Sequence, residues 1–143
     1  MSVHVEEFLA AGAKALDLQV SAGEACLRRA IPERALNRPG LALTGFFRYF
    51  AQRRIQVLGL AETTYLKSLS ASDREKRLSA FLEQHVPCVV VTRNRKPFPA
   101  LQSLCEAHHT PLLRTSMITS YFINAATIIM ERLNAPSVRV QGT

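Results

Sequence analysis

Pro87-Cys88-Val89-Val90-Val91-Thr92 places four consecutive apolar residues, three of them β-branched, directly after a proline. A strand with one solvent-exposed face would alternate apolar and polar side chains, and this stretch does not. It is also too short and too rich in β-branched residues for a buried helix, and Thr92-Arg93-Asn94-Arg95-Lys96-Pro97 closes it. We therefore predict a central strand over residues 87–92, in a parallel sheet that helices cover on both faces.

Strands and helices alternate on both sides of this run. We predict strands over residues 54–59, 87–92 and 111–114, and helices over residues 61–69, 70–82, from Pro99 onward, and 118–133. In the last helix, the spacing of apolar residues predicts an inward face made of Ile118, Tyr121, Phe122, Ala125, Ile129 and Leu133. This order of elements, with short connections, indicates two right-handed βαβ units. The predicted fold class is therefore α/β, a three-layer Rossmann-like domain with a mainly parallel sheet.

The first fifty residues follow a less regular pattern. We predict a helix over residues 3–15, a half-buried strand over 16–20, a short strand over 26–31, and a short helix over 40–44 that Gly45 closes. An aromatic cluster follows at residues 46–50. We interpret this cluster as an anchor onto the core rather than as a platform for stacking nucleic-acid bases.

Length and composition predict a single soluble domain over residues 1–143. No apolar run approaches the roughly 20 residues that cross a bilayer, and the N-terminus lacks a signal-peptide pattern. Cys26, Cys88 and Cys105 are widely spaced and form no C-x-x-C pair, so we expect buried free thiols. Together these features predict a cytoplasmic protein with no membrane partner.

The formal net charge of +7 and the isoelectric point near 9.9 raise the hypothesis of a nucleic-acid-binding domain. The basic residues are scattered, however, and neither a recognition-helix motif nor a glycine-rich aromatic RNA-binding strand accompanies them. We predict that most of them form a solvated surface, and keep nucleic-acid binding as an alternative function. Salt-dependent DNA binding would favour it, because phosphate contacts release counterions.

The sequence contains none of the common catalytic motifs. The phosphate-binding pattern G-x-x-x-x-G-K-S/T, the dinucleotide pattern G-x-G-x-x-G, the zinc pattern H-E-x-x-H and the hydrolase pattern G-x-S-x-G are all absent. The adjacent His108 and His109 would point about 100° apart on a helix, so they cannot chelate one metal ion together. We therefore predict neither catalytic residues nor metal ligands in this chain.

The edge of the sheet at which the parallel strands end is the remaining place for a site. Ligands of open α/β sheets bind beyond the carboxyl ends of the strands, where hydroxyl groups, an arginine and helix N-termini would hold a small anion. The candidate ligand-binding residues are Gly59, Glu62, Thr63, Thr92, Arg93, Asn94, Thr115 and Ser116. A small-ligand or anion sensor using these loops is thus a second alternative function. Alternatively, these residues are ordinary polar loop tips that cap helices and bind no ligand.

Several blocks of the sequence, in a characteristic order and spacing, resemble the N-terminal domain of the HPr kinase/phosphorylase family. The blocks are Arg38-Pro39-Gly40-Leu41-Ala42-Leu43-Thr44-Gly45-Phe46-Phe47, Arg54-Ile55-Gln56-Val57-Leu58-Gly59, residues 87–93, residues 111–115, Glu131-Arg132-Leu133 and Val138-Arg139-Val140-Gln141-Gly142. They extend over nearly the whole chain. The chain departs from the family at Gln141, where the family usually has histidine.

The resemblance implies a fold similar to the N-terminal domain of the MurF ligases, followed in the family by a C-terminal P-loop kinase domain. Members of the family phosphorylate a serine of the phosphocarrier HPr with ATP and Mg²⁺, reverse the reaction with phosphate, and assemble as hexamers. This chain stops at Thr143, before any P-loop, so none of the family's ATP-, metal- or HPr-binding residues can be carried over to it.

We therefore expect a non-catalytic regulatory or interaction domain of a bifunctional HPr serine kinase/phosphorylase that acts in carbon metabolism. The expected partners are the kinase domain of the parent protein, the HPr phosphocarrier and further copies of the chain. No cofactor is expected in this segment, and ATP and Mg²⁺ would belong to the parent.

Overall fold

The structure is a computed structural model that describes residues 3–135, and its centre is a sheet of five strands. The strand order is β2-β7-β6-β5-β4. Strands β4, β5, β6 and β7 are parallel to one another, and β2 pairs antiparallel with β7 at one edge. The bounds are β2 Leu18–Ala22, β4 Leu36–Asn37, β5 Ile55–Leu58, β6 Val89–Val91 and β7 Leu112–Thr115. The predicted α/β fold with a mainly parallel sheet is confirmed.

Strand β6 lies in the middle of the sheet, and all three of its residues are buried. Its side chains alternate between two hydrophobic cores, one on each face of the sheet. Val90 belongs to one core, whereas Val89 and Val91 belong to the other. An unbroken apolar run is what a strand covered on both faces requires, so the prediction of a central strand is confirmed.

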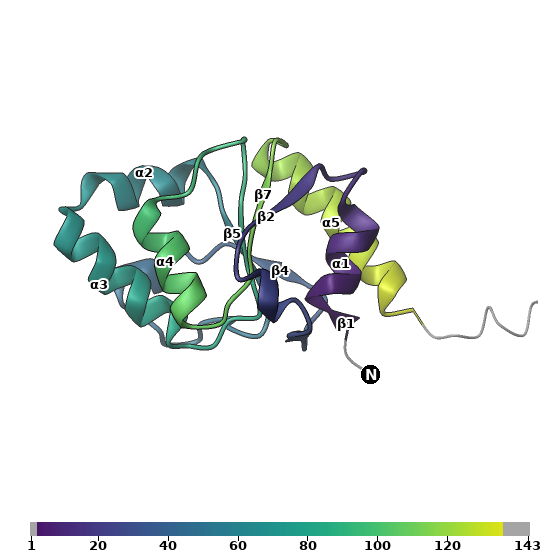
Figure 1. Ribbon diagram of the computed structural model, residues 1–143, viewed down its shortest axis with the longest axis horizontal. Helices are drawn as coiled ribbons and strands as arrows, with labels where there is room; N and C mark the ends of the chain where they lie inside the picture. Colours follow the sequence, from purple (N-terminus) through teal and green to yellow (C-terminus); the bar gives the residue numbers. More distant parts are fainter. Residues whose placement is uncertain (1–2, 136–143) are drawn as a thin grey trace, which may run out of the picture.

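Helices cover both faces of the sheet and make three layers (Figure 1). The helices α1 (Val5–Gly12) and α5 (Thr119–Leu133) cover one face. The other face is covered by α2 (Leu60–Ser68), α3 (Ala71–Leu82) and α4 (Pro99–Ala107), which connect the parallel strands β5, β6 and β7. Each face therefore has its own core, with Phe8 and Phe122 in the first and Leu78, Phe81 and Leu101 in the second.

Local capping chemistry sets several helix boundaries where the sequence predicts them. The backbone N–H of Asp73 donates to Ser70 Oγ at 3.1 Å, which caps the start of α3. Pro99 occupies the first turn of α4. Gly45 follows the short 3₁₀ helix η2 (Ala42–Thr44) with φ of 94°, and its N–H donates to Ala42 O. This left-handed backbone conformation favours glycine, because glycine has no Cβ that would clash with the backbone.

The N-terminal segment differs from the prediction. Val3–His4 form strand β1, which pairs antiparallel with β3 (Ala30–Ile31), so α1 begins at Val5 and ends earlier than predicted. The predicted strand over residues 26–31 is reduced to β3, because Glu24–Cys26 form the 3₁₀ helix η1. The pairing of β1 with β3 joins segments more than twenty residues apart, which a local periodicity does not reveal.

The buried face of α5 also differs from the predicted one. Ile118 and Tyr121 are 47% and 65% exposed. The fully buried stripe is instead Thr119, Phe122, Ala126 and Met130. Apolar residues occur around most of this helix, so several stripes with helical spacing compete in the sequence, and contact with α1 and the sheet selects one of them.

The three cysteines are free thiols, of which Cys88 and Cys105 are buried as predicted and Cys26 is half-buried. Burial raises the pKa of Cys88 and of Cys105 to about 12. Both therefore remain protonated near neutral pH and pack as apolar side chains rather than as nucleophiles.

The family-like block Val138-Arg139-Val140-Gln141-Gly142, including the departure at Gln141, lies outside the described residues. Among residues 3–135, none of the helices combines the length and the apolar character needed to span a membrane.

Candidate functional site

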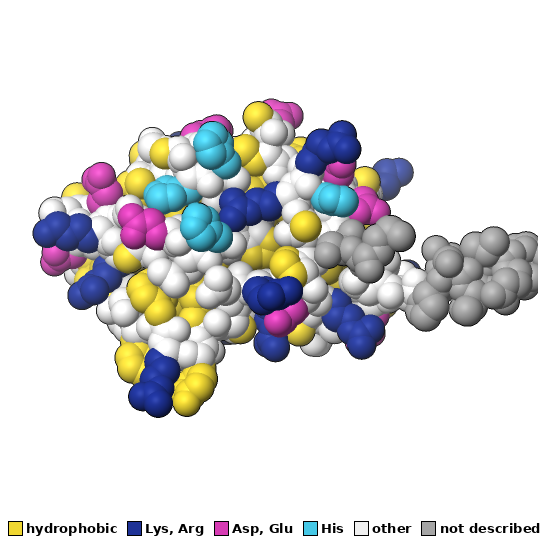
Figure 2. Space-filling view, turned by 90° about the horizontal axis from the view of Figure 1, so that it is seen from below, with side chains coloured by type: hydrophobic (Ala, Val, Ile, Leu, Met, Phe, Trp, Pro, Cys, Tyr) yellow, Lys and Arg dark blue, Asp and Glu magenta, His cyan; other side chains and the backbone are white. Residues whose placement is uncertain are grey.

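Positive charge is not gathered on the face of the molecule drawn in Figure 2. Lys and Arg side chains there are interspersed with acidic, apolar and histidine side chains. A protein that follows a nucleic-acid backbone presents a continuous basic patch or stripe. This face therefore gives no support to nucleic-acid binding as the function.

The carboxyl ends of β5, β6 and β7 lie together at one edge of the sheet, as their parallel register requires. Two backbone hydrogen bonds join the loop after β6 to the last residue of β7 and to the loop that follows it. Arg93 N–H donates to Met117 O at 2.8 Å, and Asn94 N–H donates to Thr115 O at 2.8 Å. Arg93 and Asn94 both have positive φ, 63° and 53°. The structure thus brings the candidate residues of these two loops together.

Gly59 and Glu62 belong to a closed group of hydrogen bonds with Arg38. The Glu62 carboxylate accepts from Arg38 Nη2 at 2.6 Å, from Arg38 Nε at 3.1 Å and from the N–H of Gly59 at 2.9 Å. A Cβ on Gly59 would lie 2.5 Å from Arg38 Nη2 and 2.7 Å from Thr119 Oγ1, so a larger residue here would force these side chains to shift. These bonds connect Arg38, the residue after β4, to the start of α2. The Glu62 carboxylate therefore already accepts hydrogen bonds from donors of the protein itself.

The hydroxyl groups of Thr92 and Thr115 are also used within the protein. Thr92 Oγ1 lies 2.7 Å from Thr119 Oγ1, and both residues are buried. The Thr115 hydroxyl donates to the carbonyl of Leu16 and accepts from the N–H of Met117 at 3.1 Å. These bonds tie the strand ends to neighbouring segments, so neither hydroxyl faces the solvent.

Four of the candidate residues remain at or near the surface. Arg93 lies in a shallow depression with Arg38 and Ile118. Ser116 and Asn94 are exposed, and Asn94 O accepts from Arg114 Nη2 at 3.0 Å. Thr63 is the only one of the eight candidates that lines the deeper cavity described next.

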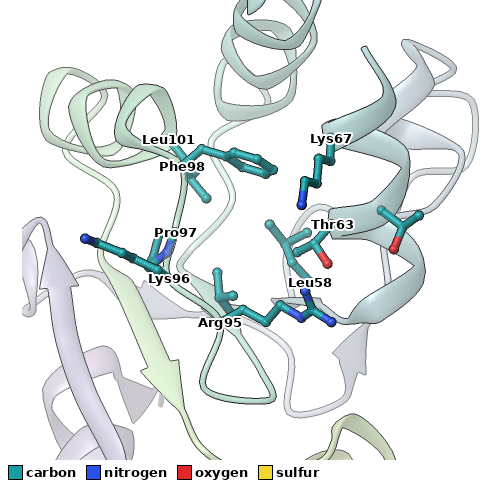
Figure 3. Close-up of a pocket in the computed structure, with 10 residues that line it drawn as sticks. Leu58, Thr63, Lys67, Arg95, Lys96, Pro97, Phe98 and Leu101 are labelled. Atoms are coloured by element: carbon teal, nitrogen blue, oxygen red, sulfur yellow. The ribbon is translucent and has the colours of Figure 1, made fainter.

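A cavity of about 190 Å³ opens at the carboxyl ends of β5 and β6, between α2 and the loop that leads from β6 to α4 (Figure 3). We call it the α2–α4 cavity. Its floor is apolar, because the buried side chains of Leu58, Val91 and Leu101 form it. Thr63 and Thr64 line it from α2.

Three cationic residues contribute to the lining of this cavity, and none of its lining residues is Asp or Glu. Lys67 comes from α2, and Arg95 and Lys96 come from the loop after β6. Figure 3 shows Lys67 and Arg95 reaching into the hollow from two walls, whereas Lys96 points away from it. Within residues 3–135, none of the three forms an ion pair.

Arg74 of α3 holds the walls of the α2–α4 cavity together. Its guanidinium donates to Leu66 O at 2.8 Å, to Leu69 O at 3.1 Å and to Lys67 O at 3.4 Å, all at the C-terminal end of α2. The same guanidinium lies 4.6 Å from the centre of the Phe98 ring, which also lines the cavity. One side chain thus satisfies the free carbonyls of α2 and fixes the residue that precedes α4.

Sequence reasoning selected Thr63 but missed Lys67 and Arg95. Lys67 follows Thr63 by four residues, so the two share a face of α2. This spacing is a signal that the sequence does contain. The facing position of Arg95 across the cavity depends on the path of the loop after β6, for which the sequence offers no comparable signal.

Residues 3–135 provide neither the P-loop nor the cluster of metal ligands with which many proteins hold a nucleotide and its magnesium ion. Gly40 and Gly45 have the glycine spacing of a P-loop, but Phe46 and Phe47 stand where the motif requires lysine and serine or threonine. Histidine side chains gather on the face drawn in Figure 2. In the described part of the chain, however, no group of three His, Cys, Asp or Glu residues is placed to hold a metal ion. The only carboxylate buried among residues 3–135 is that of Glu62, which Arg38 already binds.

Comparison with known protein families finds one that matches most of the chain. The family model described as HPr Serine kinase N terminus matches residues 3–130. An HPr kinase/phosphorylase of Caldicellulosiruptor bescii is 37% identical over 116 residues, which are 80% of this chain and 37% of that protein. A putative HPr kinase/phosphorylase 2 of Oceanobacillus iheyensis is 35% identical over 138 residues, 96% of this chain and 42% of that protein. The chain thus spans about two fifths of the length of these relatives.

Among solved structures, the fold is similar to the CBS and DRTGG domains of the regulatory region of Clostridium perfringens pyrophosphatase, a structure that contains the activator diadenosine tetraphosphate. The TM-score is 0.58 at 11% sequence identity, over 87% of this chain and 46% of that one. At this identity the likeness concerns the fold alone.

Proposed function

This chain belongs to the family of HPr serine kinase N-terminal domains, and on that premise we propose that it is the regulatory and interaction domain of an HPr kinase/phosphorylase, without catalytic activity of its own. The observation that carries the proposal is the extent of the match. The family model covers residues 3–130, the sheet and most of α5, whereas the chain spans only 37% and 42% of two relatives named for the activity.

The chemistry of phosphoryl transfer supports a non-catalytic role. The reaction needs a cradle for the nucleotide phosphates and bound metal ions that neutralise the developing charge. The P-loop pattern with its lysine is absent from all 143 residues, and the Glu62 carboxylate is held by Arg38 and Gly59. The proposal therefore assigns ATP, Mg²⁺ and the phosphorylation of HPr to the parent protein, in a part of it that this chain does not include.

An exposed apolar surface supports an interaction role. Leu41, Phe46 and Tyr49, in and beside the aromatic cluster of residues 46–50, are 68%, 52% and 89% exposed. The other part of that cluster anchors onto the core as predicted. Phe47 and Phe50 are half-buried against it, and the Phe50 ring centre lies 5.7 Å from that of Phe81. Exposed apolar side chains gathered in one loop are typical of a contact surface. In the proposal, the kinase domain of the parent and further copies of the parent are the partners.

The first test is of catalysis. Residues 1–143, incubated with labelled ATP, Mg²⁺ and HPr, should form no phosphoserine above the level without enzyme, because the chain supplies neither a phosphate cradle nor a metal site. The full-length C. bescii relative is the positive control in the same assay. Circular dichroism and a cooperative thermal transition would show that the short chain is folded. Phosphoserine formed by the folded chain would refute the non-catalytic assignment.

The second test is of regulation. Residues 3–130 of this chain replace the matching segment of the C. bescii enzyme, and a third protein lacks that segment altogether. The deleted enzyme should still phosphorylate HPr but differ from the intact enzyme in its assembly and its response to inorganic phosphate, and the chimera should restore both. If all three proteins behave alike, the domain has no regulatory or interaction role. If only the deleted enzyme is inactive although folded, the domain takes part in catalysis.

A further inference from the structure

The α2–α4 cavity has an electrostatic character that the proposed function does not use. Lys67 and Arg95 both point into it, no carboxylate lines it, and within residues 3–135 neither cation is neutralised by an ion pair. Two unpaired cations that face the same small space repel each other, so the pair is more stable when an anion lies between them. A group with two negative charges matches them best, and the fork of an arginine binds phosphate oxygens in a bidentate way.

The rest of the cavity is suited to an apolar group rather than to a free ion. Leu58, Val91 and Leu101 form a buried floor, and the Phe98 ring lies at the wall, held by Arg74. These side chains give the inner part of the cavity an apolar lining, and small-molecule sites commonly combine such a lining with a few polar groups that fix orientation. The volume of about 190 Å³ is below the roughly 300–1,000 Å³ of pockets for drug-sized ligands, so the ligand is small.

The position in the fold agrees with this reading. The cavity lies beyond the carboxyl ends of β5 and β6, where open α/β sheets bind their ligands, and beside the N-terminal end of α4. The partial positive charge of a helix N-terminus adds to the attraction for an anion there. Lys67, Arg95 and this helix end thus act in the same direction on one small volume.

We propose that the α2–α4 cavity binds a small organic phosphate monoester, with its phosphate between Lys67 and Arg95 and its apolar part on Leu58, Val91 and Leu101. The site differs from the loop residues predicted from the sequence, of which it includes only Thr63. The proposal concerns this cavity alone, and it holds whether or not the chain regulates a kinase.

The test uses amide NMR spectra of ¹⁵N-labelled residues 1–143, titrated separately with phenyl phosphate, inorganic phosphate and benzoate. Phenyl phosphate should give saturable shifts of the amides of Thr63, Lys67, Arg95 and Leu101. Inorganic phosphate lacks the apolar part and benzoate lacks the second charge, so both should bind more weakly. Added salt should weaken phenyl phosphate binding, because charge contributes to it.

Three variants make the test specific to the geometry. Lys67→Ala and Arg95→Ala should each weaken phenyl phosphate binding by about tenfold, the factor that corresponds to one lost hydrogen bond from a charged donor. Lys96→Ala is the matched control. It removes a positive charge from the same rim, but the Lys96 side chain points away from the cavity. The affinity of this variant for phenyl phosphate should stay within about twofold of that of the unmodified chain. The dispersed amide spectrum of each variant reports that it is folded.

Several results would overturn the proposal. One is the absence of saturable shifts at about ten millimolar phenyl phosphate, where a site of millimolar affinity would be nearly filled. A second is that the shifts are confined to another face of the molecule. A third is that Lys96→Ala loses as much affinity as Lys67→Ala and Arg95→Ala, which would mean diffuse attraction to a basic surface. Binding of benzoate or inorganic phosphate as tight as that of phenyl phosphate would contradict the assigned ligand class.

Discussion

Replacing Val90 with aspartate should cost the domain at least about 5 kcal/mol of its free energy of unfolding, comparable to the whole stability of many domains. Val90 has no exposed surface and lies in β6, paired with Val57 of β5 on one side and with Leu113 of β7 on the other. The described structure offers no cationic partner among these neighbours, so the carboxylate would be buried unpaired or would have to be protonated. The expected result is a chain without a cooperative unfolding transition at 25 °C, measured by urea denaturation followed by circular dichroism.

Two further variants separate the charge from the loss of apolar volume. Val90→Ala creates only a small cavity and should lose about 1–3 kcal/mol while keeping a cooperative transition. Gln19→Asp places the same carboxylate on the edge strand β2, where the residue is exposed, and should change the stability by less than about 0.5 kcal/mol. If the melting temperature of Val90→Asp lies within a degree or two of that of the unmodified chain, β6 is not a central strand covered on both faces.

Replacing Arg38 with methionine should lower the free energy of unfolding by about 2–3 kcal/mol, because the buried Glu62 carboxylate would lose two of its three donors. Glu62 is only 6% exposed, so water cannot fully replace the guanidinium. The Arg38 side chain is itself 43% exposed, which places the expected loss below that of a fully buried pair. Urea denaturation at neutral pH, followed by circular dichroism, measures the difference.

A double-mutant cycle and a surface control identify the cause of this loss. Glu62→Gln in the Arg38→Met background should recover part of the stability, because it removes the unpaired charge and keeps an acceptor for the N–H of Gly59. Arg53→Met is the control, since Arg53 is 66% exposed and its Nε lies 3.9 Å from Glu33 Oε2, and it should change stability by less than about 1 kcal/mol. An Arg38→Met variant no less stable than Arg53→Met would show that the Arg38–Glu62 pair contributes nothing.

The regular second half of the chain was predictable because its signals are local. The apolar run of β6, Ser70 ahead of α3 and Pro99 in the first turn of α4 each act within a few residues. The first half was less predictable because β1 pairs with β3 across the whole of α1 and β2. The inward face of α5 was mispredicted at Ile118 and Tyr121, because an apolar helix has more than one plausible stripe.

In the candidate site, too, local features were predictable from the sequence and contacts between distant segments were not. The sequence predicted that the candidate residues lie at one edge of the sheet, since parallel strands end together, and the structure places them at that edge. The sequence did not show that Glu62 is bound by Arg38, 24 residues away, or that the Thr115 hydroxyl is bound by Leu16, 99 residues away. Nor did it show that Lys67 and Arg95 face one cavity.

The sequence by itself therefore determined the type and order of most elements in the second half of the chain and the central place of β6. Apolar periodicity and capping depend on residues within about one helical turn or one strand, so one sequence read in order contains them. Only the tertiary structure decided which polar groups of Glu62, Thr92 and Thr115 are already bonded, and which cations of residues 3–135 line the α2–α4 cavity. Those outcomes depend on contacts between segments far apart in the chain, and such contacts form only when the sheet and its helices pack.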